Sequence, residues 1–260
     1  MWRTLTSVCL AALMLVSCSV KQDRIDCPCT FSLDLSGCVI YDDVLTFSLW
    51  SDSQKIISDY YYRRDLGQRY EYELTRKSYE ASVLSGDVNS VHSGRNLLVK
   101  KGAQSDSLYA WAASLDARQE TFYSLVVLYK QFATITFDLS EYDSSGESFD
   151  VKVKGNYGGI DILTLDPVEN VFEYEFTTNG SGLYPVRIPR QGDDALTLEV
   201  SSTGKILAEI PVGNTIRRIG YDWTSLDLND MTVAISYENP TATVYVDVGD
   251  WTQEEQTDRI

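Results

Sequence analysis

The feature that most constrains this chain is an alternation of apolar and polar residues with a period of two, which recurs from Phe31 to Val248. Successive side chains of a β-strand point to opposite faces, so such alternation marks strands with one face in a core and the other in water. Many short alternating segments separated by glycine turns predict antiparallel β-sandwiches rather than a parallel α/β sheet. The clearest segments are 31–35, 70–74, 133–139, 151–153, 196–200 and 244–248.

Helical periodicity is weak throughout the sequence. No stretch of about 12 residues shows apolar residues at i, i+3, i+4 and i+7, the pattern of an amphipathic helix. Any helix is therefore expected to be short, and the two segments that could form one are Ser225–Asp230 and Gly86–Arg95.

The first residues are typical of an export signal. One early cation, Arg3, precedes an unbroken apolar stretch at 8–16, which is too short to span a bilayer. The small residue Ser17 then precedes Cys18. This arrangement resembles the lipobox of bacterial lipoproteins, whose cysteine becomes the first mature residue and is acylated, so we expect lipidation at Cys18. The alternative, a cysteine that merely ends a signal peptide, is weaker because the apolar stretch and the small-residue site agree.

The charge of the chain is strongly acidic. It has 22 Lys and Arg against 38 Asp and Glu, a net charge of −16. Removing Arg3 with the signal leaves 21 basic against 38 acidic residues, which makes the mature charge −17. Such a surface repels phosphates and excludes nucleic acid as a partner. The single histidine, His92, also excludes most metalloenzymes and most Ser-His or Cys-His hydrolases.

Motifs for catalysis are all incomplete. Gly180-Ser181-Gly182 lacks the third glycine of a dinucleotide fingerprint, and Thr203-Gly204-Lys205 lacks the Ser or Thr of a phosphate loop. The start of a calcium loop at Glu141 fails because Lys152 occupies the position of its bidentate glutamate. Paired carboxylates are plentiful, but nothing selects a pair for glycoside hydrolysis, so a carboxylate-pair hydrolase has the least support. We expect no enzymatic activity, no metal and no cofactor.

Three cysteines remain in the mature chain after Cys18, namely Cys27, Cys29 and Cys38. In an oxidising envelope compartment one disulfide is expected, from either Cys27 or Cys29 to Cys38, with one thiol left over. Cys27-Pro28-Cys29 has one intervening residue rather than the two of a thioredoxin-like site, and no second pair completes a zinc tetrad. The sequence therefore favours a structural disulfide near the first strand.

Tyrosine supplies the one local hint of recognition. The chain has 17 tyrosines, and Tyr60, Tyr61, Tyr62, Arg63 and Arg64 form a cluster that is a candidate recognition surface. Tyrosine and arginine are common in such surfaces, and aromatic rings also stack on sugars. The competing interpretation is that these tyrosines are ordinary strand residues, because a tyrosine packs with its ring and keeps its hydroxyl in water.

Several segments resemble one known family. They are Cys18 to Cys29 with the Asp26-Cys27-Pro28-Cys29 motif, Phe31 to Gly37, Ile188 to Asp194, Ile219 to Trp223, and the last strand at 243–248 with Asp250-Trp251 after it. Taken together, they resemble lipoproteins of the Bacteroidales fimbrial anchor-subunit family, the minor fimbrillins of type V pili.

The resemblance implies an all-β fold of two tandem transthyretin-like antiparallel β-sandwich domains. We expect a lipoprotein signal peptide at 1–17, an anchor segment at 18–30, sandwiches at 31–130 and 131–251, and a polar tail at 252–260. The resemblance also implies an anchor or accessory subunit, held by lipid in the cell outer membrane and exposed at the surface. Its partners would be other fimbrial subunits, bound by β-strand pairing. The alternative function is a surface glycan-binding lipoprotein that uses aromatic platforms.

Overall fold

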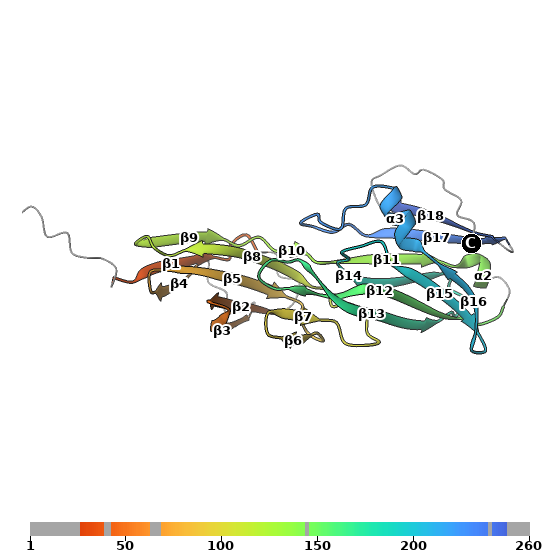
Figure 1. Cartoon of the computed structure of the whole chain (residues 1–260), viewed down its shortest axis with the longest axis horizontal. Helices are drawn as coiled ribbons and strands as arrows, with labels where there is room; N and C mark the ends of the chain where they lie inside the picture. Colours follow the sequence, from red (N-terminus) through yellow and green to blue (C-terminus); the bar gives the residue numbers. More distant parts are fainter. Residues whose placement is uncertain (1–26, 39–42, 63–68, 144–145, 239–240, 249–260) are drawn as a thin grey trace, which may run out of the picture.

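The structure is a computed structural model that describes residues 27–38, 43–62, 69–143, 146–238 and 241–248. The expected signal peptide, most of the expected anchor segment and the polar tail lie outside these residues. The described part consists of two β-sandwiches placed end to end along the long axis of the molecule (Figure 1). The prediction of an all-β chain built from sandwiches is confirmed.

The first sandwich packs a sheet of three strands on a sheet of five. The three-stranded sheet has the order β4 (Arg69–Leu74), β1 (Cys29–Asp34) and β9 (Thr121–Leu125). The five-stranded sheet has the order β10 (Tyr129–Lys130), β8 (Tyr109–Asp116), β5 (Ser78–Ser85), β2 (Val44–Ser51) and β3 (Gln54–Tyr62). The alternation seen in the sequence lies on these strands: Phe31 and Leu33 of β1 are fully buried, whereas Thr30 and Ser32 are only half-buried.

The second sandwich is built in the same way. Its first sheet has the order β14 (Leu183–Pro189), β11 (Phe132–Asp138), β17 (Met231–Glu238) and β18 (Thr241–Val248). Its second sheet contains β16 (Lys205–Ile210), β15 (Thr197–Ser202), β12 (Asp150–Asp161) and β13 (Pro167–Thr177), with β7 (Asn96–Leu98) and β6 (Val91–Ser93) added to β12. Two short helices, α2 (Ser140–Asp143) and α3 (Val212–Arg218), lie in connections.

Most strand pairs are antiparallel, and each sandwich adds one parallel pair. The first strand of each half is central in its sheet: β1 pairs antiparallel with β4 and parallel with β9. In the same way, β11 pairs antiparallel with β14 and parallel with β17. In each sandwich the chain thus returns from the larger sheet to the smaller one, and the returning strand, β9 or β17, runs in the same direction as the first strand.

The two sandwiches are joined by a hairpin and by an apolar cluster. The β6–β7 hairpin precedes β8 in the chain, yet it pairs with β12 of the second sandwich, with Leu97 opposite Ile160. At Gly159 a Cβ atom would lie 2.5 Å from the Leu97 carbonyl oxygen, so only glycine permits this approach. Residues from both halves form a buried cluster around the hairpin: Trp50, Leu84, Leu97, Leu108, Ala110, Ile160, Ile162 and Leu163.

Both helix expectations from the sequence are wrong. Segment 86–95 forms a loop, the strand β6 and a turn, because the Asp106 carboxylate binds the backbone N–H groups of Asn89 and Ser90. Segment 225–230 is irregular. The helix in this region is instead α3, which is stabilised by tertiary packing of the buried residues Val212 and Ile216.

Candidate functional site

The residues that the sequence singled out do not form one site. Cys18, Arg63 and Arg64 lie outside the described residues, so lipidation at Cys18 stays a prediction. The remaining candidates are Cys27, Cys29 and Cys38 around β1, and Tyr60, Tyr61 and Tyr62 at the end of β3.

The three cysteines are free thiols in the structure. Cys27 is exposed, while Cys29 is fully buried in β1 opposite Leu74 of β4. The Cys38 thiol is half-buried and donates to the Val126 carbonyl oxygen at 3.5 Å. Burial, with a smaller contribution from the nearby Asp34 carboxylate, raises the pKa of Cys38 to about 11. A thiol with this pKa is a poor nucleophile, and the expected disulfide stays a prediction.

The tyrosine cluster is divided between two faces of β3. Tyr60 and Tyr62 are 64% and 46% exposed on the outer face. Tyr61 points the other way, where its ring packs against Tyr70 with centroids 4.1 Å apart. Burial, together with the Asp59 carboxylate, raises the pKa of Tyr61 above its usual value. Among the described tyrosines of this cluster, Tyr60 and Tyr62 are therefore the two with exposed rings.

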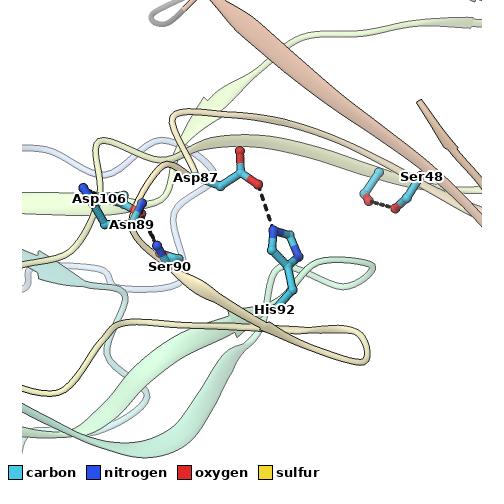
Figure 2. A network of polar contacts seen from close by, with 7 residues as sticks. Ser48, Asp87, Asn89, Ser90, His92 and Asp106 are labelled. Carbon is cyan, nitrogen blue, oxygen red and sulfur yellow. Dashed lines mark hydrogen bonds and ion pairs between the residues drawn. The ribbon is translucent and has the colours of Figure 1, made fainter. Parts of the chain in front are cut away.

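The polar cluster around His92 positions a loop rather than a nucleophile (Figure 2). The His92 ring lies 2.9 Å from Asp87. Asp106 is buried and accepts hydrogen bonds from the backbone and side chains of Asn89 and Ser90. Ser48 is itself buried and hydrogen-bonded to Ser82 at 2.8 Å. The Asp106 network therefore fixes the loop that leads into the β6–β7 hairpin.

A cavity of about 650 Å³ lies beside the junction of the sandwiches, lined by Gln131, Asp166, Arg190, Arg217 and Trp223 among others. The Arg190 guanidinium is 4% exposed and donates to Gln131 Oε1 and to the carbonyl oxygens of Trp223 and Leu226. Burial lowers the pKa of this guanidinium. Arg217 pairs with Asp194 at 3.0 Å. These arginines therefore hold the cavity wall together.

Within the described ranges, no group of three or more His, Cys, Asp or Glu side chains is placed to hold a metal ion. No helix in this part of the chain is long and apolar enough to cross a membrane.

The edges of the sheets are the remaining surface that can bind a partner through the backbone. An edge strand carries peptide N–H and C=O groups that can pair with another chain. In the first sandwich, β9 forms one edge of the three-stranded sheet (Figure 1). Thr121, Tyr123 and Leu125 are exposed on its outer face, and Tyr123 donates to Asp34 of β1 at 2.7 Å. β9 is not among the residues predicted from the sequence, although the absence of charge in 121–125 is visible there.

The sequence matches no protein-family model and no curated protein. Solved structures nevertheless share the fold over 88% to 92% of this chain, and this is the two-sandwich fold found in bacterial fimbrial proteins and proposed adhesins. One is the fimbrial anchor protein Mfa2 from Porphyromonas gingivalis, with a TM-score of 0.62 and 11% identity over 88% of this chain and 100% of that chain.

Two further solved structures share this fold. A proposed polysaccharide-binding protein from Bacteroides thetaiotaomicron gives a TM-score of 0.59 at 12% identity, covering 89% of this chain and 98% of that chain. A proposed adhesin from Bacteroides ovatus gives 0.58 at 12% identity, covering 92% and 98%. At such identities the likeness establishes the fold alone. It confirms, at the level of the fold, the resemblance to minor fimbrillins.

Proposed function

We propose that this protein is an outer-membrane lipoprotein that serves as an anchor or accessory subunit of a fimbrium. The observation that carries the proposal is the fold shared with a fimbrial anchor protein over the full length of that protein. The lipobox-like sequence at Cys18 supports attachment to the outer membrane through acyl chains, with the two sandwiches at the cell surface. Several acyl chains, at about 0.8 kcal/mol per buried methylene, make such an anchor effectively permanent.

The same proposal divides the chain into five segments. A signal peptide at 1–17 and an anchor segment at 18–30 precede sandwiches at 31–130 and 131–251, with a polar tail at 252–260. The start of β11 at Phe132 supports a boundary near Lys130. The β6–β7 hairpin crosses this boundary, since it lies within 31–130 in the sequence but pairs with β12 of the 131–251 sandwich.

Partner subunits are bound, on this proposal, by β-strand pairing. Main-chain hydrogen bonds supply affinity and alternate side chains supply specificity, so the function needs no catalytic residue, metal or cofactor. This agrees with the incomplete catalytic motifs of the sequence and with the structural role of Asp106 and Arg190. The protein is therefore proposed not to be an enzyme.

Two changes in the native cell test the proposal. Replacing Cys18 with Ala should move the protein out of the outer-membrane fraction and abolish labelling by a palmitate analogue. Deleting the whole chain should release fimbriae into the medium or change their length, measured by electron microscopy and by the ratio of shed to cell-bound fimbrial protein. Unchanged attachment and length after deletion would refute a fimbrial role.

A second candidate function is glycan binding, favoured by one observation. Tyr60 and Tyr62 are two positions apart on one strand, and both are exposed on the same face. Such rings can stack on sugars. Saturable binding on a glycan array that is lost in the double variant Tyr60→Ala/Tyr62→Ala, but kept in Tyr123→Ala, would support it. Tyr123 is a suitable control because it is 52% exposed on a different sheet.

A further inference from the structure

The cavity beside the junction of the sandwiches has the size and the position of a small-molecule site. Its volume is about 650 Å³, within the range of roughly 300–1,000 Å³ for such sites, which often lie where two domains meet. Ala112 of β8 contributes to the wall from the first sandwich, and Gln131 lies between β10 and β11. The rest of the wall comes from residues 163–167 around the β12–β13 turn and from the segments 190–194 and 213–226.

The wall of this cavity is preorganised. Arg190 fixes the segment 223–226 through two of its carbonyl oxygens. In the β12–β13 turn, the Asp161 carboxylate accepts the Leu163 N–H at 2.9 Å, and Leu165 adopts a positive φ of 63°. A left-handed backbone is uncommon for leucine and costs free energy, and strain of this kind is concentrated at functional sites such as ligand clamps. Groups that are already fixed lose less free energy when a ligand binds.

Two aromatic residues belong to the same wall. The rings of Tyr221 and Trp223 pack edge to face with centroids 4.8 Å apart, and both residues are half-buried. The Tyr221 hydroxyl donates to the Asn229 carbonyl oxygen at 2.7 Å, which fixes this ring. Such residues combine a large apolar ring with a polar group, and they therefore suit a ligand that carries both C–H groups and hydroxyls.

Two polar groups of the wall have spare capacity for hydrogen bonds. Trp223 is bonded through its backbone carbonyl, and Asp166 through its backbone N–H and carbonyl. Within the described ranges, neither the Trp223 Nε1 nor the Asp166 carboxylate has a hydrogen-bond partner. A hydroxyl group can accept from an indole N–H and donate to a carboxylate. These two groups are therefore complementary to the hydroxyls of a ligand.

The charged groups of the wall are already matched with one another. Arg190 donates to Gln131 and to carbonyl oxygens, and Arg217 pairs with Asp194 at 3.0 Å. Neither guanidinium is thus free to bind a phosphate or a carboxylate. Burial lowers the pKa of Arg190, and the Asp166 carboxylate is one of the groups whose charge opposes this shift. A neutral ligand fits such a wall better than an anion or a cation.

We propose that this cavity binds a neutral saccharide, with a sugar ring against Tyr221 and Trp223 and with its hydroxyls bonded to Trp223 Nε1 and to the Asp166 carboxylate. The inference goes beyond the anchoring of a fimbrium and does not depend on it, so either proposal can fail alone. It also assigns the sugar to the junction of the sandwiches, and not to Tyr60 and Tyr62 on β3.

A glycan array probed with the full chain tests the class of ligand. We expect saturable binding to neutral oligosaccharides, and none to oligosaccharides that carry sulfate, sialic acid or uronic acid. Binding to charged glycans alone, or to no glycan on the array, would overturn the proposal.

Two small substitutions then test the site, with the neutral glycan that binds most strongly on the array as the probe. Trp223→Phe keeps an aromatic ring but removes the Nε1 donor, and it should weaken binding about fivefold. Asp166→Asn removes a charged acceptor and should weaken binding about tenfold. Glu169→Gln is the matched control, because Glu169 is also an exposed carboxylate but lies on β13 outside the cavity wall. It should bind as the parent chain does.

Urea midpoints separate lost binding from lost folding. A variant with the midpoint of the parent chain is folded, and if one cavity substitution lowers the midpoint, the other decides. Parent-like binding in folded Trp223→Phe and Asp166→Asn would overturn the proposal. So would loss of binding in Tyr60→Ala/Tyr62→Ala, because the sugar would then lie on β3.

Discussion

The two sandwiches return to their first sheet in different ways. In the first sandwich, residues 117–120 alone connect β8 to β9, and β9 ends the sheet among the described strands. In the second, residues 211–230 connect β16 to β17 and include α3, and β18 then covers β17. α3 contributes Val212 and Ile216 to the core beneath this edge. One strand order is thus compatible with an open or a closed edge: after β9 the chain passes to β10 of the other sheet, whereas after β17 it turns back as β18.

The largest expected effect comes from truncating the central phenylalanine of each first strand. Phe31 lies between Tyr72 and Phe122, and Phe137 lies between Tyr184 and Val233. Both phenylalanines are fully buried. Replacing either with Ala should lower the free energy of unfolding by about 3–5 kcal/mol, because each change removes a large apolar group and leaves a cavity.

The two variants should differ in how much unfolding free energy they lose. Phe31 is next to the half-buried Phe122, which can move into the cavity, whereas Val233, the β17 neighbour of Phe137, is held by β18. Phe31→Ala should therefore lie at the lower end of the range and Phe137→Ala at the upper end. Urea unfolding measures the free energy of unfolding of both variants. A larger loss for Phe31→Ala would show that the first sandwich is as tightly closed as the second.

The second prediction tests whether the sandwiches unfold as one unit. A Cβ atom in Gly159→Ala would overlap the Leu97 carbonyl, so β7 must move away from β12 and disturb the cluster that joins the halves. We expect a loss of about 1–3 kcal/mol and a change from one calorimetric transition to two.

Gly158→Ala is the matched control for this prediction. Its Cβ atom would lie 2.6 Å from the Asn170 carbonyl oxygen, which belongs to β13 of the same sandwich. The variant should lose stability without separating the transitions. If Gly159→Ala still unfolds in a single transition, the hairpin does not couple the two halves.

The third prediction contrasts the arginines that support the two connections. Arg190 is buried and binds the carbonyl oxygens of Trp223 and Leu226 in the long connection. Arg190→Met should destabilise the protein by about 2–3 kcal/mol, because these acceptors and Gln131 lose a charged donor. Arg190→Lys should not restore the loss, since an ammonium group cannot reproduce the planar set of donors.

Arg118 in the short connection is the control. Its guanidinium pairs with Asp116 at 2.7 Å, and its side chain is 70% exposed. Exposed pairs of this kind contribute little, so Arg118→Met should leave the urea midpoint unchanged. Equal effects of the two substitutions would mean that burial does not distinguish the connections.

The sequence predicted the strands well where one face of a strand is buried. Alternation at 31–35, 133–139 and 244–248 marked β1, β11 and β18, since each packs one face on a core. The helix α3 was missed because its stability comes from tertiary contacts: Gly213 is needed where a Cβ atom would lie 2.3 Å from the Asp194 carbonyl oxygen. Pairing of the β6–β7 hairpin with β12 is a long-range contact without a local pattern.

The candidate sites were harder to predict than the fold. Three consecutive tyrosines conceal the alternation of β3, so the sequence could not show that Tyr61 points inward while Tyr60 and Tyr62 point outward. The edge at β9 depends on which strands are neighbours, and a single sequence does not contain that information. The absence of charge in 121–125 gains meaning only once β9 is known to be an edge.

The smallest expected effect concerns the carboxylate that links β1 to β9. Asp34 accepts hydrogen bonds from the Ser36 backbone and from the Tyr123 hydroxyl, and Arg69 lies 3.9 Å away. The hydrogen bonds from Ser36 and Tyr123 lower the pKa of Asp34 from 3.8 to about 2. Because the folded pKa is the lower one, the stabilisation is complete above pH 3.8 and is lost as the pH falls through 2.

Asp34→Asn should therefore be less stable than the parent chain at neutral pH, and the difference should shrink as the pH falls from 3.8 towards 2, measured by urea midpoints across this range. Tyr123→Phe is the control, since it removes the donated hydroxyl but keeps the ring on β9. It should raise the pKa of Asp34 towards its ordinary value and narrow the pH range over which the midpoint changes. A midpoint difference between Asp34→Asn and the parent chain that does not shrink between pH 3.8 and pH 2 would show that the carboxylate charge does not hold β9 to β1, leaving the edge fixed by backbone pairing alone.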